Sequence, residues 1–172
     1  QRWVILSSFE ISKHEITNAQ YRSFVEATHR PIPRGHKRET VWQDESLNQD
    51  HQPVVGVTWY DAQAFAEWIG ASLPSEAQWE RAARGGRGAR YPWGNAPPTR
   101  TSANFARRHQ STVTVGNYPE GNTAEGVSDM AGNVWEWCLD AYDPHFYAIG
   151  KERNPVNQRD RNFLEDRVIR GG

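Results

Sequence analysis

The chain has 172 residues, and its 20 Lys and Arg against 21 Asp and Glu give a formal net charge of −1. This balance provides neither the basic surface of a nucleic-acid-binding domain nor a polybasic membrane-binding segment, so we expect no nucleic acid and no membrane among its partners. A single cysteine, Cys138, excludes an intramolecular disulfide and any structural zinc site with several thiolates.

The first elements that we predict are a strand and a helix. Residues 3–11 form a plausible strand because Phe9 and Ile11 alternate with polar neighbours. Thr17 followed by Gln20 has the spacing of a capping box, in which each side chain bonds the other residue's free backbone amide. The spacing predicts a helix over 18–28.

Two further helices follow a long polar segment, 29–52, that we interpret as a loop. Thr58 with Asp61 predicts a helix over 59–69, ended by Gly70. Ser75 with Gln78 predicts a helix over 75–84, ended by a glycine pair.

The second half has a different pattern. Residues 87–128 are rich in turn-forming types and lack helical periodicity, with a possible short strand at 112–115. Large and polar residues alternate over 132–137, which predicts a strand there. A polar segment at 144–166 is interpreted as a loop, and 167–170 as a last short strand. Helices that precede short strands indicate an α+β fold, and the absence of repeats or a low-complexity linker predicts one domain over 1–172.

Isolated titratable residues give little evidence of chemistry. The six histidines include no pair with the i,i+4 spacing of a metalloprotease helix, so we interpret them as surface residues. Cys138 lies between Trp137 and Leu139, which favours a buried structural thiol.

The segment 129–136 has the residue types of a calcium site. Asp129 and Glu136 bracket a tight backbone around Gly132, and calcium prefers carboxylate and carbonyl oxygens together. The alternative is a turn with an Asn cap and a solvated Glu. The residues alone leave both open.

Five segments of the chain carry distinctive motifs, which are PVVGVTWYDA at 53–62, LPSEAQWERAARGG at 73–86, YPWG at 91–94, DMAGNVWEW at 129–137 and RVIRGG at 167–172. These five blocks, in register, resemble the formylglycine-generating enzyme (sulfatase-modifying factor) superfamily, and the segment EITNAQY at 15–21 also looks like the first helix of that family. The resemblance covers nearly the whole chain and is specific for the superfamily, though not for one function.

The resemblance implies an elaborated C-type-lectin-like fold, α+β with little regular secondary structure. It also implies a calcium site with Asp129 and Glu136 as side-chain ligands and Gly132 and Val134 as carbonyl ligands. A second family calcium site would begin at Asn104, but the acid expected in the following loop is absent from 106–113.

The family's catalytic copper is bound by two cysteines in a last segment, which we expect beyond residue 172. The chain begins at Gln1, so we interpret it as part of a longer protein, with its localisation undetermined. The resemblance therefore assigns no catalytic and no cofactor-binding residue within 1–172.

Two functions stay open. The first is a non-catalytic module that binds a protein or small-molecule ligand, such as a diversity-generating retroelement variable protein. The second is a copper-dependent oxidase that converts a protein cysteine to formylglycine, with the iron-dependent sulfoxide synthases of thiohistidine biosynthesis as a neighbouring variant.

Eight tryptophans in a chain of this size indicate a core of large aromatic side chains. We expect six of them to be mostly buried rather than arranged as a sugar-stacking surface. These are Trp59, Trp68, Trp79, Trp93, Trp135 and Trp137.

Overall fold

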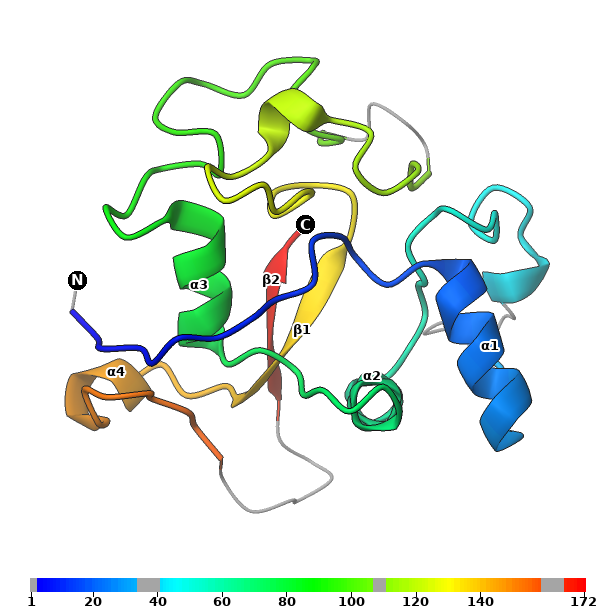
Figure 1. The fold of residues 1–172 in the computed structure, drawn as a ribbon, viewed down its shortest axis with the longest axis horizontal. Helices are drawn as coiled ribbons and strands as arrows, with labels where there is room; N and C mark the ends of the chain where they lie inside the picture. The colour runs from blue at the N-terminus through cyan, green and yellow to red at the C-terminus, as the bar shows by residue number, and fades with distance from the viewer. Residues whose placement is uncertain (1–2, 34–40, 107–110, 159–165) are drawn as a thin grey trace.

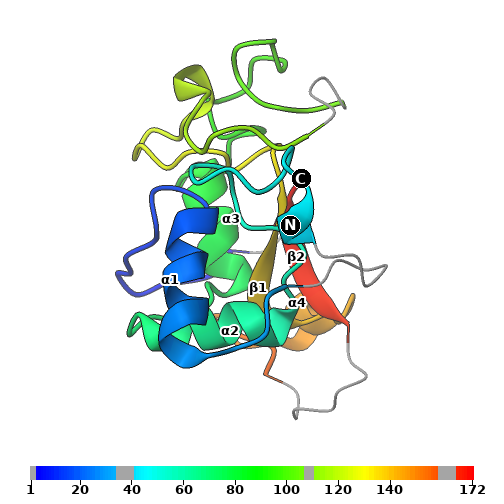
Figure 2. The ribbon, with the colours of Figure 1, turned by 90° about the vertical axis from the view of Figure 1, so that its right-hand side faces the viewer.

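A computed structural model describes residues 3–33, 41–106, 111–158 and 166–172. Two short antiparallel strands lie at the centre, with helices beside them and long loops around them (Figure 1). The loop-rich part of the chain that follows α3 lies above one end of the strands, at the top of both Figure 1 and Figure 2. This arrangement is α+β with little regular structure, as predicted.

The three predicted helices are present, each with its capping box. They are α1 (Asn18–Thr28), α2 (Trp59–Trp68) and α3 (Glu76–Arg84). Thr17, Thr58 and Ser75 each accept a hydrogen bond from the backbone amide three residues later. Short-range capping therefore predicted where these helices begin.

Strand β1 (Trp135–Ala141) pairs antiparallel with β2 (Arg167–Gly171). Trp135 lies opposite Gly171 and Trp137 opposite Ile169, and the register shifts before Ala141 pairs with Arg167. Helices α2 and α3 contact β1, so the first half of the chain packs against a strand from the second half.

Two apolar clusters form the core. One cluster joins Trp79 of α3 to Cys138 of β1 and Val168 of β2. The other joins Tyr21 and Phe24 of α1 to Phe65 of α2, with the Tyr21 and Phe65 rings stacked at 5.6 Å between centroids. Large aromatic side chains thus hold the helices together, as the composition indicated.

Three strand predictions were wrong in position or type. Residues 3–11 run extended, but only Ile5 forms a bridge, to Arg153, so this segment has no partner strand along its length. Residues 112–115 form no strand, and β1 begins at Trp135, because the turn before it includes Gly132 and Asn133 at positive φ.

Three short helices were not predicted: η1 (Val41–Gln43), η2 (Pro119–Gly121) and α4 (Phe146–Ile149). Each has three or four residues, which is too short for apolar periodicity to appear in the sequence. No helix of the described residues is long and apolar enough to cross a membrane.

The tryptophan prediction was right in part. Trp59 and Trp79 are buried, and Trp93 and Trp137 are partly buried. Trp68 is 44% exposed and Trp135 is 62% exposed, so the prediction that these two side chains are buried was wrong. Trp135 faces outward because its neighbour Glu136 takes the inward position of the alternating strand.

Candidate functional site

The turn before β1 has a backbone that glycine and asparagine make possible. Asp129, Gly132 and Asn133 have φ values of 57°, 90° and 64°, in the left-handed region. A Cβ at Gly132 would lie 2.4 Å from the carbonyl oxygen of Asn104, so no larger residue fits without a shift of the backbone. Asn133 N donates to that same oxygen at 2.9 Å, which fixes the turn against residue 104.

The Asn133 side chain connects this turn to two distant segments. Its Oδ1 accepts from Val113 N at 2.9 Å. Its Nδ2 donates to Glu15 Oε2 at 2.7 Å. The amide therefore positions Glu15, which precedes α1, beside the turn.

Three carboxyl groups lie within electrostatic range of one another here. Asp129 accepts from Gly116 N at 2.5 Å, and burial raises its pKa. Glu136 accepts from Trp79 Nε1 at 3.1 Å, and burial raises its pKa to about 7. Burial, together with the charges of Asp129 and Glu136, raises the pKa of Glu15 to about 9.

Two of the predicted ligand oxygens border the same space. A Cβ at Gly171, on the facing strand, would lie 3.1 Å from the Val134 carbonyl oxygen and 3.5 Å from Glu136 Oε1. The bare backbone of Gly171 thus leaves room next to both oxygens. Glu15 Oε1, in the same cluster, is buried without a hydrogen-bond partner.

This donor set fits a hard cation such as calcium. The set combines carboxylates with a carbonyl, and burial raises the pKa values of Glu15 and Glu136, so a bound cation would offset the cost of ionising these groups. In the described part of the chain, no three His, Cys, Asp or Glu side chains converge as metal ligands by themselves. An ion here would therefore need main-chain oxygens as well. The family resemblance implies the carbonyl oxygens of Gly132 and Val134 for this role.

Sequence reasoning found Asp129 and Glu136 but missed Glu15. The two predicted acids lie on one local motif, whereas Glu15 and Asn133 are 118 residues apart. Glu15 is the first residue of the motif segment 15–21, but nothing in that segment relates it to residues 129–136. Only the fold brings it there.

Cys138 is a structural thiol, as predicted. It is fully buried in the cluster around Trp79, and burial raises its pKa. Its carbonyl oxygen accepts from Trp59 Nε1 at 2.7 Å, which joins β1 to α2. A buried thiol with a raised pKa is neither a nucleophile nor an accessible metal ligand.

The histidines are dispersed. His29, His51 and His145 are exposed and His14 is half-buried, and no metal-binding cluster includes them among the described residues. His36 and His109 lie outside the described residues. The interpretation of the histidines as surface residues holds for three of the four described.

Comparison with known proteins identifies the family. The model of the sulfatase-modifying factor enzyme 1-like domain matches residues 1–172. The chain belongs to this family. It is 30% identical to a formylglycine-generating enzyme of Thermomonospora curvata over 99% of this chain and 72% of that protein.

Other family relatives have different names. The chain is 38% identical to serine/threonine-protein kinase pkn1 of Chlamydia pneumoniae, over 98% of this chain but only 28% of the kinase. It is 32% identical to hercynine oxygenase of Mycolicibacterium smegmatis, over 98% of this chain and 46% of that protein. Among solved structures, PvdO from Pseudomonas aeruginosa superposes with a TM-score of 0.74 at 25% identity, covering 93% of this chain and 66% of PvdO.

Proposed function

We propose that this chain is the scaffold domain of a family oxidase that converts a protein cysteine to formylglycine. The observation that carries the proposal is the match to the T. curvata enzyme over 99% of this chain and 72% of that protein. The likeness to a hercynine oxygenase also favours an oxidoreductase.

The residues of this chain do not supply the copper site that the family resemblance implies. A pair of thiolates is needed, and the one cysteine, Cys138, is buried with a raised pKa. Copper ligands would therefore come from outside residues 1–172. The role of this domain is to hold such a segment next to β2, whose end at Gly171 packs against the turn 129–136.

The test uses the full-length protein that contains this chain. It is incubated aerobically with copper and a cysteine-containing sulfatase peptide, and the aldehyde product is detected by mass spectrometry. We expect conversion, and we expect Cys138→Ala to retain it because that thiol contacts no accessible surface. Absence of conversion by copper-loaded, folded protein would reject the oxidase.

A non-catalytic binding module is the second candidate. It is favoured by the inert state of Cys138 and by the likeness to pkn1, a protein in which the matched part covers only 28% of the length. This candidate predicts a folded protein without oxidase activity that retains a protein or small-molecule ligand. The peptide assay above separates the two, because only the oxidase produces the aldehyde.

We also propose that Asp129 and Glu136, with the carbonyls of Gly132 and Val134, hold a structural calcium ion. The buried carboxyl groups and the space beside Gly171 support it. The ion would offset the repulsion between the acids and connect the turn to β1. Its role is to stabilise the fold, and no chemical step passes through it.

Removal of calcium provides the test. A ligand that binds only the folded state stabilises it by about 2.7 kcal/mol at a hundredfold excess over Kd. We therefore expect a chelator to lower Tm and added calcium to restore it. The variant Glu136→Gln should lose this response, while Glu67→Gln, on the exposed face of α2, should keep it. Equal Tm with and without chelator would remove calcium from the proposal.

A further inference from the structure

The extended segment 3–8 has one hydrogen-bonded edge and one free edge. On the bonded edge, Ile5 N donates to the Glu152 carbonyl at 2.8 Å, and the Ile5 carbonyl accepts from Asn154 N at 2.8 Å. Ser7 N donates to Asn154 Oδ1 at 2.8 Å. The main-chain groups of Ile5 and Ser7 thus point to the same side of the segment.

The residues between and beside these two direct their main-chain groups the other way. In an extended chain, the N–H and C=O groups of successive residues point to opposite edges. Val4, Leu6 and Ser8 therefore present theirs on the second edge, and within the described part of the chain these groups form no hydrogen bond. A free edge of this kind can pair with an extended peptide.

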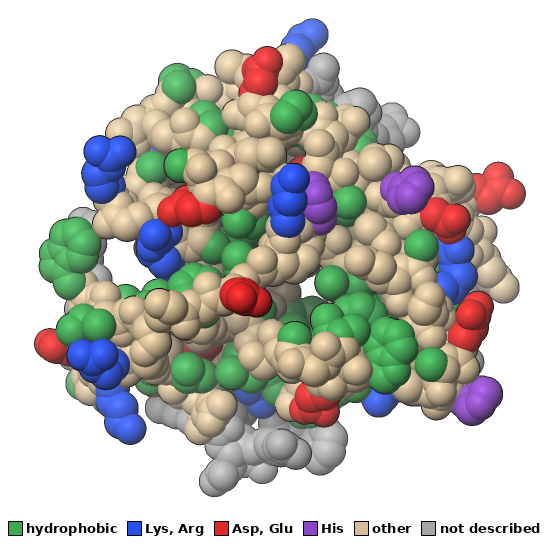
Figure 3. Space-filling model, in the orientation of Figure 1, with side chains coloured by type: hydrophobic (Ala, Val, Ile, Leu, Met, Phe, Trp, Pro, Cys, Tyr) green, Lys and Arg blue, Asp and Glu red, His purple; other side chains and the backbone are tan. Residues whose placement is uncertain are grey.

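The free edge borders a cavity of about 1290 Å³ between the segment and α3. Figure 3 shows the surface hollowed there. Val4, Leu6 and Ser8 line the cavity, whereas Ile5 does not. Ser8 is exposed, and Val4 and Leu6 are half-buried, so a ligand in the cavity can reach this edge. The volume exceeds the range of about 300–1000 Å³ for small-molecule sites and has room for several peptide residues.

One face of α3 and the loop after it form the opposite wall of the cavity. Ala77, Arg81 and Arg84 line it, at positions i, i+4 and i+7 of one helical face. Gly85 and Gly88 also line it, and neither has an atom within 4 Å of the place that a Cβ would take. These small residues leave the space in front of the wall open to a ligand.

The charged residues of this cavity are positive in excess, with three arginines against two glutamates. Arg84 Nη1 contacts Glu80 Oε1 at 2.8 Å. Arg81 Nη1 contacts Glu125 Oε1 at 3.0 Å. Arg87 is exposed and has neither an ion pair nor a hydrogen bond with another described residue. A negatively charged ligand would therefore gain a partner without breaking an existing pair.

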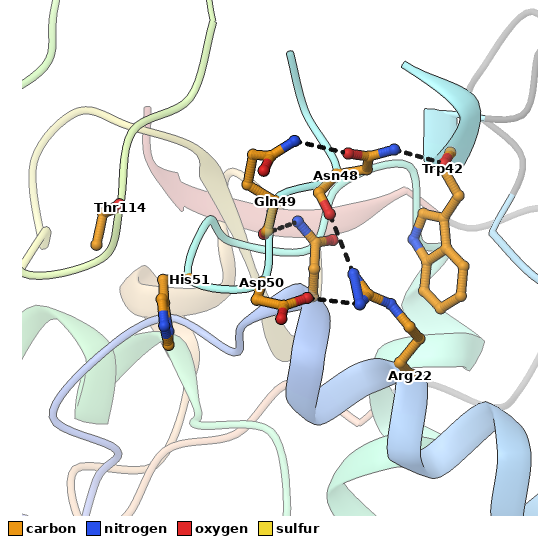
Figure 4. A pocket seen from close by; sticks show the side chains of 8 residues that line it. Arg22, Trp42, Asn48, Gln49, Asp50, His51 and Thr114 are labelled. Carbon is orange, nitrogen blue, oxygen red and sulfur yellow. Dashed lines mark hydrogen bonds and ion pairs between the residues drawn. The ribbon is translucent and has the colours of Figure 1, made fainter. Parts of the chain in front are cut away.

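A smaller cavity of about 640 Å³, beside α1, lacks this excess of charge. Arg22 Nη1 contacts Asp50 Oδ1 at 2.6 Å, and Arg22 Nη2 donates to the Asn48 carbonyl at 3.0 Å, as Figure 4 shows. The two charges compensate each other. A charged ligand would have to break this pair, so the cavity beside α3 is the better candidate for one.

We propose that the cavity beside α3 binds an extended peptide of alternating apolar and acidic residues, which adds as a strand to the free edge. Val4 and Leu6 are half-buried, whereas Ile5 and Ser7 are exposed, so an added strand would place apolar side chains on the inner face and acidic ones toward solvent. A peptide is favoured over an anionic amphiphile because it supplies N–H and C=O groups along the edge. The proposal depends neither on the oxidase function nor on calcium.

Fluorescence anisotropy tests the proposal, with the labelled peptide Val-Glu-Val-Glu-Val and the full-length protein that contains this chain. We expect saturable binding, and weaker binding of Val-Lys-Val-Lys-Val, which has the same apolar residues and the opposite charge. Arg87→Gln should weaken binding of the acidic peptide about two- to fivefold, the effect of one exposed charge pair. The matched control Arg90→Gln changes an exposed residue outside the cavity and should bind as the wild type does.

A second pair of variants tests the main-chain pairing. Ser8→Pro removes the free N–H of residue 8, so it should weaken binding about five- to tenfold, the effect of one lost hydrogen bond. Ser8→Ala keeps that N–H and should bind as the wild type does. Tm of each variant reports whether the fold is retained, and Arg87→Gln keeps the proposal testable if Ser8→Pro lowers it.

Three results would each overturn the proposal: no saturable binding up to about 1 mM, equal affinity for the acidic and the lysine peptide, or equal affinity of Ser8→Pro and Ser8→Ala. Another segment of the full-length protein in the cavity would give the first result. The third result, together with displacement of the peptide by decanoate, would identify a site for an anionic amphiphile instead.

Discussion

Glycine 132 and asparagine 133 show how two residue types determine the turn that precedes β1. Gly132 is required on two grounds, a φ of 90° and the closeness of the Asn104 carbonyl. Asn133 tolerates its own φ of 64° and uses its amide to bond Val113 and Glu15. The Asn133 amide thereby positions the Glu15 carboxyl group beside the turn.

Alanine variants of Gly132 and Gly126 separate the cost of an unfavourable φ from the cost of a steric clash. Gly132→Ala should lower stability by more than about 2 kcal/mol, because it adds a close contact to an unfavourable φ. Gly126→Ala is the matched control, since Gly126 has a φ of 84° but no atom within 4 Å of the place that a Cβ would take. Gly126→Ala should cost about 1 kcal/mol, because alanine is strained at a left-handed φ. If both variants lose the same free energy of unfolding in urea, the backbone near Asn104 moves to accept the added methyl group and the clash adds no cost.

The raised pKa values predict how stability depends on pH. The pKa of Glu136 is about 7 and that of Glu15 is about 9 in the folded protein, against an ordinary value of 4.5. The folded state therefore binds more protons than the unfolded state above pH 4.5, so the free energy of unfolding falls as pH rises through this window. We expect Tm of chelated protein to decrease from pH about 5 to about 8.

Calcium should change that dependence, because the ion favours the carboxylate form. With calcium present, Tm should fall less over the same pH range, and Glu136→Gln should flatten the decline in chelated protein. A chelated protein whose Tm rises with pH in this window would contradict the assigned direction of both pKa shifts.

At the level of elements, Asp140 connects three segments at the start of α3. Its Oδ2 accepts from Glu76 N at 2.8 Å, and its Oδ1 accepts from Asn157 N at 2.8 Å. Asn157 in turn exchanges two hydrogen bonds with Ala141 at the end of β1. The buried carboxylate of Asp140 therefore supplements the Ser75 cap and joins the helix to the strand.

Asp140→Asn should be more destabilising than loss of the cap itself. An amide has one acceptor oxygen, so one of the two buried N–H groups would face an NH₂ group, at a cost of about 2 kcal/mol. Ser75→Ala should cost about 1 kcal/mol. Urea midpoints of the two variants provide the comparison, and the opposite order would mean that the helix depends on its local cap alone.

For the whole molecule, local patterns predicted the helices and the motif acids, and long-range contacts determined the rest. The capping boxes at Thr17, Thr58 and Ser75 act within four residues, so they could be recognised in the sequence. The place of Glu15 depends on Asn133, far along the chain. The exposure of Trp135 depends on which face of β1 turns inward, and that too is decided by packing against α3.

The segment 3–11 is the clearest case of long-range dependence. It crosses the molecule beside α3, and a cavity of about 1290 Å³ lies between the two, where the surface is hollowed in Figure 3. Residues 152–154 hold it through bonds to Ile5, and the Asn154 side chain accepts from Ser7 N at 2.8 Å and donates to Ser7 Oγ at 2.9 Å. These contacts join parts of the chain 147 residues apart.

Asn154→Gly should therefore loosen this segment without unfolding the molecule. Glycine keeps the φ of 44° at residue 154 and removes both side-chain bonds to Ser7. We expect faster hydrogen exchange at the Ser7 amide, while the amides of α3 keep their protection, because exposed segments open independently of the core. The matched change Asn95→Gly, in a turn where that side chain accepts from Arg90 N, should leave Ser7 unaffected. If exchange at Ser7 stays the same in Asn154→Gly, the backbone bonds of Ile5 alone hold the segment in place.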